Sequence, residues 1–326
     1  MRSYNPSFLR GKSCIAEVAT LQVEFLYLSR VTGDGRFAAA GDKVMRCVEA
    51  HLPADGLMPM YINPETGEFE RSVVTLGARS DSAYEYLLKQ WLIVGDGAAR
   101  EERRWVANMY QRSVRGVLDK LVRTSSPSNL TYVCERGPNG ALQHKMDHLV
   151  CFVPGMLALW QVVVDHGNAT DVAFADETLG VAERLMHTCM EMYRRSATGL
   201  APEIVQFKAN HDFVPSTGAS HSLLRPEAVE SLFVLWRVTR NETYREWGWE
   251  IFTAINRHAR VEGGGFSGLK DVNKAEKGLN DKMESFFVSE TLKYLYLMWA
   301  DERLLPLDRF VFNTEAHPLS MPGPAG

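Results

Sequence analysis

Apolar residues recur at spacings of three and four along most of the chain, and short turns with Gly, Pro or Asp separate these stretches. This spacing gathers the apolar residues on one face of an α-helix. The pattern predicts nine amphipathic helices, over residues 14–31, 35–51, 80–95, 99–123, 148–165, 172–196, 226–240, 243–260 and 284–299.

Two of the helix ends share a local pattern, LSRVTGDGRF at 28–37 and LWRVTRNETY at 235–244. Each reads as a helix, a short polar turn and a second helix that starts on an aromatic residue. A repeated helical hairpin is typical of a toroid or solenoid built from αα units.

Short extended segments lie between the helix pairs. They favour β-hairpins at one end of a helical barrel, where loops carry function. The segments are 57–63 with 67–74, 130–136 with 141–146, and 202–207.

Composition excludes some classes of function. The 326 residues are 45% hydrophobic, enough for a large core, and the net charge is −4 without a basic stripe, so nucleic acid is not expected as a partner. No apolar run is long enough for a transmembrane segment, and no signal sequence opens the chain. Five cysteines without metal-site spacing read as reduced core thiols.

Several carboxylates sit inside otherwise apolar or aromatic runs, where an ionised group is costly unless it is compensated. Each one can be explained as a helix cap, because acids are favoured at helix starts. If the helix starts open on one face of a barrel, however, the acids converge on one pocket. Such a pocket suits glycoside hydrolysis or Ca²⁺ binding, and Phe286 or Phe287 could stack on a sugar ring or simply pack in the core.

A series of segments makes this more specific. In order, they are AEVATLQVEFLYLSRVTGD, TLGARSDSAYEYLLKQW, KMDHLVCFVPGMLAL, PEIVQF, LLRPEAVESLFVLWRVT, DKMESFFVSETLKYLYL and VFNTEAHPL. This series resembles the successive signatures of the class I α-1,2-mannosidases, glycoside hydrolase family 47. The likeness runs from about residue 10 to residue 319 and is closer to the processing mannosidases of the endoplasmic reticulum and Golgi, with the endoplasmic reticulum type favoured.

The resemblance implies a fold dominated by α-helices, an (α/α)7 toroid barrel with short inserted β-hairpins. Residues 1–326 would form the larger, C-terminal part of one catalytic domain, incomplete at the N-terminus. The family's first catalytic signature, a helix of the type E-x-T-I-R-x-L-G-G-L-L, has no counterpart here. We therefore expect weak or no mannosidase activity from this chain.

The resemblance also implies a reaction, the inverting hydrolysis of terminal α-1,2-linked mannose from high-mannose N-glycans. Glu227 matches the family's general base, and Asp81 matches a catalytic carboxylate proposed as an acid. A non-catalytic protein that binds high-mannose glycans for quality control is the alternative.

Calcium is the implied cofactor, with Thr314 supplying its hydroxyl and carbonyl oxygens. The remaining matched residues would hold the calcium waters or contact the sugar. They are Glu17, Arg79, His148, Arg225, Glu230, Glu284, Phe286, Glu290 and Glu315.

Cys151 and Cys189 match the family's disulfide, which revises the thiol interpretation for this pair. Together with sequons at Asn129, Asn168 and Asn241, this implies the lumen of the endoplasmic reticulum or Golgi. Family members there are usually membrane-anchored.

Overall fold

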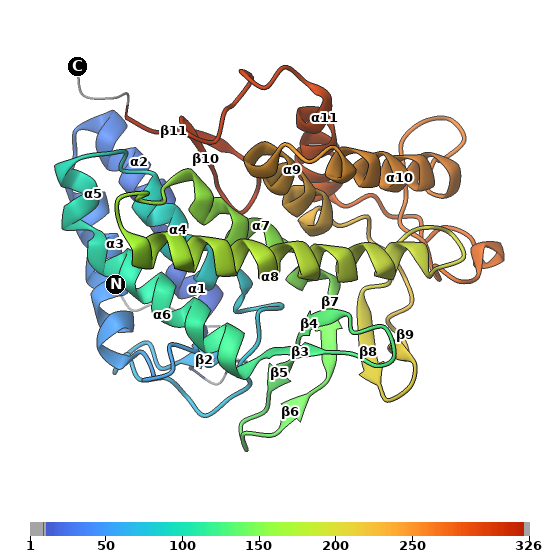
Figure 1. Cartoon of the computed structure of the whole chain (residues 1–326), viewed down its shortest axis with the longest axis horizontal. Helices are drawn as coiled ribbons and strands as arrows, with labels where there is room; N and C mark the ends of the chain where they lie inside the picture. The colour runs from blue at the N-terminus through green and yellow to red at the C-terminus, as the bar shows by residue number, and fades with distance from the viewer. Residues whose placement is uncertain (1–8, 10, 323–326) are drawn as a thin grey trace. The chain divides into compact units, whose positions relative to one another are not determined.

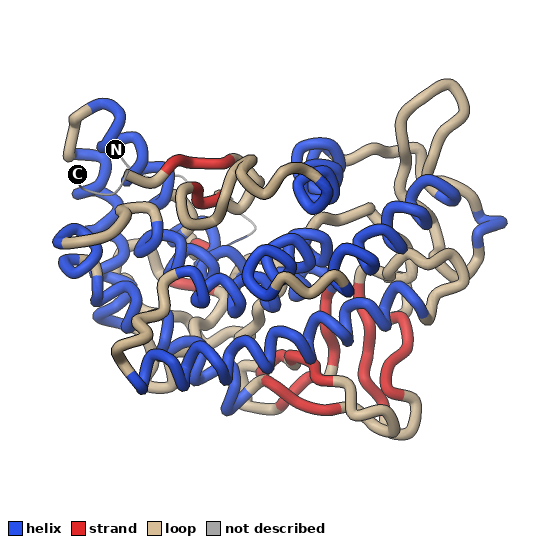
Figure 2. The backbone as a smooth tube through the Cα atoms, turned by 45° about the horizontal axis from the view of Figure 1, so that its top comes forward, coloured by secondary structure: helices blue, strands red, loops and turns tan. Residues whose placement is uncertain are grey.

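A computed structural model describes residues 9 and 11–322, and helices make up most of its regular structure (Figures 1 and 2). The chain divides into two compact units. The first unit comprises residues 1–122, 134–143 and 309–326, and the second comprises 123–133 and 144–308.

The first unit is built on α4, whose residues from Ser82 to Leu92 are all buried. Helices α1, α2 and α6 pack against it, and α3 packs on α2. The helices of this unit are α1 (Ile15–Ala19), α2 (Gln22–Thr32), α3 (Arg36–His51), α4 (Asp81–Leu92), α5 (Ala98–Glu102) and α6 (Arg104–Lys120).

Three antiparallel strand pairs complete the first unit. Strand β1 pairs with β2, which lies far from it in the sequence. The pairs β5–β6 and β10–β11 are local hairpins. The strands are β1 (Ser13–Cys14), β2 (Tyr61–Ile62), β5 (Glu135–Arg136), β6 (Leu142–Gln143), β10 (Phe310–Phe312) and β11 (Pro318–Ser320).

The second unit is centred on α7 and α9, which pack against each other and against the 26-residue helix α8. Helices α10 and α11 lie on α9. The helical elements are η2 (His148–Phe152), α7 (Val153–Ala158), η3 (Leu159–Val162), α8 (Ala169–Arg194), α9 (Glu227–Thr239), α10 (Thr243–His258), η4 (Ala275–Lys277), the π-helix η5 (Phe287–Leu292) and α11 (Lys293–Trp299).

Two small sheets belong to the second unit. Strand β8 lies between β7 and β9 in a three-stranded antiparallel sheet, and β3 pairs with β4. The strands are β3 (Val122–Thr124), β4 (Thr131–Val133), β7 (Lys145–Asp147), β8 (Ile204–Lys208) and β9 (Asp212–Pro215).

The predicted helices are confirmed in place, but four of them differ in form. The helix expected over 14–31 is interrupted between α1 and α2, and the one over 99–123 is divided into α5 and α6 at Arg103. The one over 148–165 is a short α-helix flanked by 3₁₀ turns, and the one over 284–299 begins as a π-helix. The β10–β11 hairpin was not predicted.

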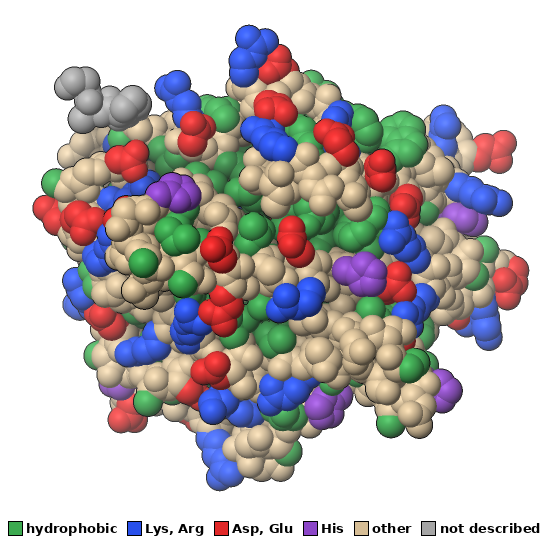
Figure 3. Space-filling view, in the orientation of Figure 1, with side chains coloured by type: hydrophobic (Ala, Val, Ile, Leu, Met, Phe, Trp, Pro, Cys, Tyr) green, Lys and Arg blue, Asp and Glu red, His purple; other side chains and the backbone are tan. Residues whose placement is uncertain are grey.

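No helix among the described residues has both the length and the apolar character needed to cross a membrane. On the face shown in Figure 3, acidic and basic side chains are interspersed, with apolar side chains between them.

Candidate functional site

The predicted site residues fall in both units. Those in the first unit are Glu17, Arg79, Asp81, Thr314 and Glu315, and those in the second are His148, Arg225, Glu227, Glu230, Glu284, Phe286 and Glu290.

Glu227 is the first residue of α9, where the helix dipole favours a carboxylate. Its Oε2 atom lies 3.2 Å from Nδ1 of His148, the first residue of η2. The imidazole is 3% exposed, and its Nε2 lies 2.7 Å from the hydroxyl of Tyr193 on α8. Two predicted residues of the second unit are therefore in direct contact.

A second ion pair lies just before α9. Arg225 Nε donates to Glu203 Oε2 at 2.5 Å, and Glu203 Oε1 accepts the backbone N–H of Leu223 at 3.0 Å. Burial opposes charge on Arg225, but the carboxylates of Glu203, Glu227 and Glu284 outweigh it and raise the pKa of the guanidinium. Arg225 thus stays a cation among these acids.

An aromatic ring accompanies this cation. The guanidinium of Arg225 lies 5.5 Å from the ring centre of Phe286, which is only partly buried. Glu284 forms an ion pair of 2.6 Å with Lys282, whose side chain is largely exposed. A half-exposed ring beside charged hydrogen-bonding groups suits the apolar face and the hydroxyls of a sugar.

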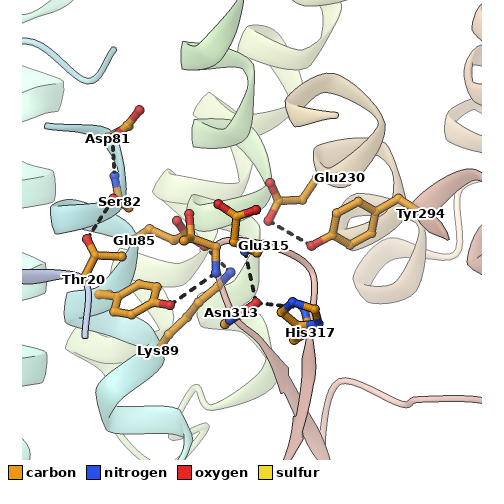
Figure 4. A network of polar contacts seen from close by, with 12 residues as sticks. Thr20, Asp81, Ser82, Glu85, Lys89, Glu230, Tyr294, Asn313, Glu315 and His317 are labelled. Carbon is orange, nitrogen blue, oxygen red and sulfur yellow. Dashed lines mark hydrogen bonds and ion pairs between the residues drawn. The ribbon is translucent and has the colours of Figure 1, made fainter. Parts of the chain in front are cut away.

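Glu230 and Glu290 lie on neighbouring elements of the second unit. Tyr294 donates to Glu230 Oε1 at 3.5 Å, a long hydrogen bond (Figure 4). Glu290 is 6% exposed within the π-helix η5, a form that occurs often at functional sites. The next residue, Thr291, donates to the carbonyl of Leu224 at 2.8 Å, which fixes η5 against the turn before Arg225.

The predicted disulfide is confirmed, since Cys151 in η2 and Cys189 in α8 are bonded. The other cysteines, Cys14, Cys47 and Cys134, take no part in a disulfide. The bond therefore ties the element that carries His148 to the helix that carries Tyr193.

In the first unit, Asp81 opens α4 and its Oδ1 accepts the backbone N–H of Ser82 at 2.9 Å. The Ser82 hydroxyl accepts a hydrogen bond of 2.8 Å from Thr20, at the end of α1 (Figure 4). The interruption after α1 therefore brings Thr20 to the start of α4.

Glu17 and Arg79 lie near the Cys14 thiol. Burial is the main reason that the pKa of this thiol is raised, and the Glu17 carboxylate adds to it. Arg79 has a left-handed backbone, with φ of 74°, and its Nη1 donates to the Tyr61 hydroxyl at 2.5 Å. A strained conformation at a non-glycine residue is typical of functional positions.

Thr314 lies in the turn between β10 and β11, and three residues hold that turn. Its N–H donates to the Tyr86 hydroxyl at 3.3 Å, and Tyr86 donates to Glu24 Oε1 at 2.6 Å. Asn313 Nδ2 donates to the same Glu24 oxygen at 2.9 Å, and Asn313 Oδ1 accepts the N–H of Glu315 at 3.0 Å.

This turn fits a hard cation. Glu24 Oε2 is buried and has no hydrogen-bond partner among the described residues, so a carboxylate oxygen beside Thr314 lacks compensation. The described residues contain no group of three or more His, Cys, Asp or Glu side chains placed to hold a metal. A calcium ion here would depend on the Thr314 oxygens and on water, which its flexible coordination permits.

Sequence reasoning missed Tyr193, Glu24, Tyr86 and Asn313 as site residues. All four act through contacts with residues 45 or more positions away. The one sequence feature that could have indicated them is a polar residue within an apolar run. Glu24 and Tyr86 share this feature with the carboxylates that the sequence analysis selected.

An open hollow of about 290 Å³ also lies on the second unit. Its lining is almost wholly apolar, so it offers few hydrogen bonds to sugar hydroxyls. The lining residues are Trp249, Phe252, Leu292, Leu295, Tyr296 and Trp299.

Known proteins resemble this chain along nearly its whole length. A mannosyl-oligosaccharide 1,2-alpha-mannosidase of Arabidopsis thaliana is 45% identical over 320 residues, which is 98% of this chain and 54% of that protein. The endoplasmic reticulum mannosyl-oligosaccharide 1,2-alpha-mannosidase of Homo sapiens is 46% identical over 330 residues, 98% of this chain and 45% of the relative. The chain spans about half the length of the curated relatives it matches.

The structure resembles that of the alpha-1,2-mannosidase from Trichoderma reesei, with a TM-score of 0.85 and 25% identity, over 96% of this chain and 67% of the other. This match confirms the helical fold class that the sequence predicted. The model of Glycosyl hydrolase family 47 matches residues 2–321. On these grounds, the chain belongs to glycosyl hydrolase family 47.

Proposed function

We propose that this chain hydrolyses terminal α-1,2-linked mannose from high-mannose N-glycans, with inversion and with Ca²⁺. The observation that carries the proposal is the carboxylate of Glu227 at the start of α9, hydrogen-bonded to His148 at 3.2 Å. A fixed carboxylate with one free oxygen is the arrangement that a general base needs.

In the proposed reaction, Glu227 takes a proton from water while the water attacks the anomeric carbon. Asp81 is the proposed acid that protonates the leaving oxygen. The two carboxyls work on opposite faces of the sugar, so an α-linkage is released as β-mannose.

Arg225 and Phe286 are proposed to bind the terminal mannose. The guanidinium donates to sugar hydroxyls, and the ring stacks on the apolar face of the sugar. Their contact in the second unit, at 5.5 Å, supports a shared role. The acids Glu17, Glu230, Glu284, Glu290 and Glu315, with Arg79, are proposed to complete hydroxyl recognition.

The calcium ion would be held by Thr314, with the uncompensated Oε2 of Glu24 close to the same turn. When bound, such an ion supplies coordination for water and sugar hydroxyls.

The proposed location is the lumen of the endoplasmic reticulum. The disulfide Cys151–Cys189 supports it, because disulfides persist in oxidising compartments. The naming of several relatives as endoplasmic reticulum enzymes supports the same location.

The test is trimming of Man9GlcNAc2 by the purified chain, followed by chromatography of the glycans and by NMR of the released sugar. We expect slow release of β-mannose, in line with the weak activity that the sequence predicts, and we expect this release to stop when EDTA removes calcium. Glu227→Gln should lower the rate by about 100-fold or more, the usual contribution of a general base. The matched control is Glu250→Gln, an exposed acid that pairs with Arg194.

Two results would contradict the proposal in different ways. Glycan binding without trimming supports the alternative, a non-catalytic protein that binds high-mannose glycans for quality control. Release of α-mannose would instead overturn the inverting mechanism.

A further inference from the structure

Three side chains of the second unit form a continuous line of hydrogen bonds. The Tyr193 hydroxyl lies 2.7 Å from His148 Nε2, and His148 Nδ1 lies 3.2 Å from Glu227 Oε2. The tyrosine is 6% exposed and the histidine 3%, so water competes little with either bond.

The chemistry of the groups fixes the direction of this line. An ionised carboxylate only accepts hydrogen bonds, so His148 Nδ1 must carry the proton that faces Glu227. In a neutral imidazole the other nitrogen is then an acceptor, and the Tyr193 hydroxyl donates to it. Burial, together with the charges of Glu227 and Glu203, raises the pKa of Tyr193, so the hydroxyl keeps the proton that it donates.

The backbone around this line is tied down on both sides. Cys151 follows His148 by three residues in η2, and Cys189 precedes Tyr193 by four residues in α8, so the disulfide links the turns that carry the two rings. The N–H of His148 also donates to the carbonyl of Glu203 at 2.8 Å. The His148 ring therefore has little freedom to change its partners.

We propose that Tyr193 is a positioning residue for Glu227, acting through His148. Its hydroxyl selects the tautomer of His148 that donates to Glu227, which holds one carboxylate oxygen and leaves the other for water. This inference rests on the proposed function of Glu227 as the base. Nothing in it requires Tyr193 to touch the sugar.

The variant Tyr193→Phe removes only the hydroxyl. We expect kcat for Man9GlcNAc2 trimming to fall about tenfold, a part of what a general base contributes, with KM changed less than twofold. The matched control is Tyr244→Phe, because Tyr244 is equally buried and its hydroxyl donates to Glu183 at 3.3 Å, outside this line. The control should keep the wild-type kcat.

The pH profile separates positioning from simple loss of packing. A hydrogen bond donated to a carboxylate lowers its pKa, so the acidic limb of the kcat profile should move to higher pH in Tyr193→Phe. Arg225 interacts with the charges of Glu227, Glu203 and Glu284, and the variant leaves all four groups in place. An unchanged limb together with an unchanged kcat would overturn the proposal.

A second readout does not depend on activity. In ¹⁵N-histidine NMR, assigned with His148→Asn, wild-type His148 should show a protonated Nδ1 and an unprotonated Nε2, and Tyr193→Phe should lose this preference. A protonated Nε2 in the wild type, or the same tautomer in the variant, overturns the positioning role. An inactive wild type with the expected tautomer change would instead count against the proposed function alone.

Discussion

The carboxylate of Asp212 accepts a hydrogen bond of 2.6 Å from the hydroxyl of Ser125. The same side chain accepts the backbone N–H of Ser128 at 2.9 Å and pairs with Arg195 at 2.9 Å. Asp212 thus joins the loop before β4 to β9 and to the end of α8. Burial alone would raise its pKa, but the hydrogen bonds from Ser125, Arg195 and Ser128 outweigh it and hold the pKa below its usual range.

Asp212→Asn should destabilise the protein by about 2 kcal/mol at pH 7, because hydrogen bonds to a buried charge are lost. Asparagine keeps the left-handed backbone of this position, where φ is 52°. A carboxyl with a depressed folded-state pKa stabilises above its unfolded pKa of about 4, and the stabilisation is lost as pH falls toward the folded value. The gap between wild type and variant in urea unfolding should therefore shrink below pH 4.

The matched control for this prediction is Asp176→Asn, an exposed acid on α8. Its unfolding free energy should differ from wild type by less than about 0.5 kcal/mol at any pH tested. A gap for Asp212→Asn that grows in acid would contradict the argument.

The disulfide gives a second prediction. Replacing Cys151 and Cys189 by alanine should cost about 3–4 kcal/mol of unfolding free energy, since the bond closes a loop of 38 residues. Urea unfolding under non-reducing conditions measures the effect. Cys47→Ala, at an exposed free thiol, is the control, and a loss below about 1 kcal/mol in the double variant would argue against a stabilising role.

Two helical glycines should respond in opposite ways to alanine. A Cβ on Gly116 in α6 would lie 2.0 Å from the carbonyl oxygen of Asp55, so Gly116→Ala should destabilise by about 1–3 kcal/mol. Gly180 in α8 has room, and its nearest neighbour would be the flexible end of Arg184 at 3.5 Å. Gly180→Ala should therefore stabilise by about 0.5–1 kcal/mol, and thermal unfolding of both variants checks the contrast.

Calcium should stabilise the protein through Thr314. A ligand at 100 times its dissociation constant adds about 2.7 kcal/mol to the native state, so Ca²⁺ should raise the melting temperature and EDTA should reverse the rise. Thr314→Ala should abolish this response, whereas Thr170→Ala, at an exposed position on α8, should retain it. An equal response in both variants would place the ion elsewhere.

Helices with a clear apolar period were predictable from the sequence almost to the residue. The prediction over 35–51 became α3 at Arg36–His51, and that over 243–260 became α10 at Thr243–His258. The π-helix η5 and the break after α1 could not be read in this way, because tertiary contacts decide them. One such contact is the hydrogen bond from Thr20 to Ser82.

In the candidate site, too, some residues could be predicted from the sequence and others could not. Sequence motifs predicted Glu227 and His148 as site residues, and the structure shows that their side chains are in contact. Tyr193 gave no signal because it lies in an ordinary amphipathic helix. Its relation to His148 depends on how α8 packs against η2, which the local sequence does not encode.

The first unit takes its segments from both ends of the chain, residues 1–122 and 309–326 together with 134–143. Asn313 reaches Glu24 across 289 positions of sequence. Glu24 leaves the ribosome 289 residues before Asn313, so the Thr314 turn can form only after the whole of the second unit has been synthesised. Until then the nascent chain holds α2 and α4 without this partner, which leaves them to chaperones.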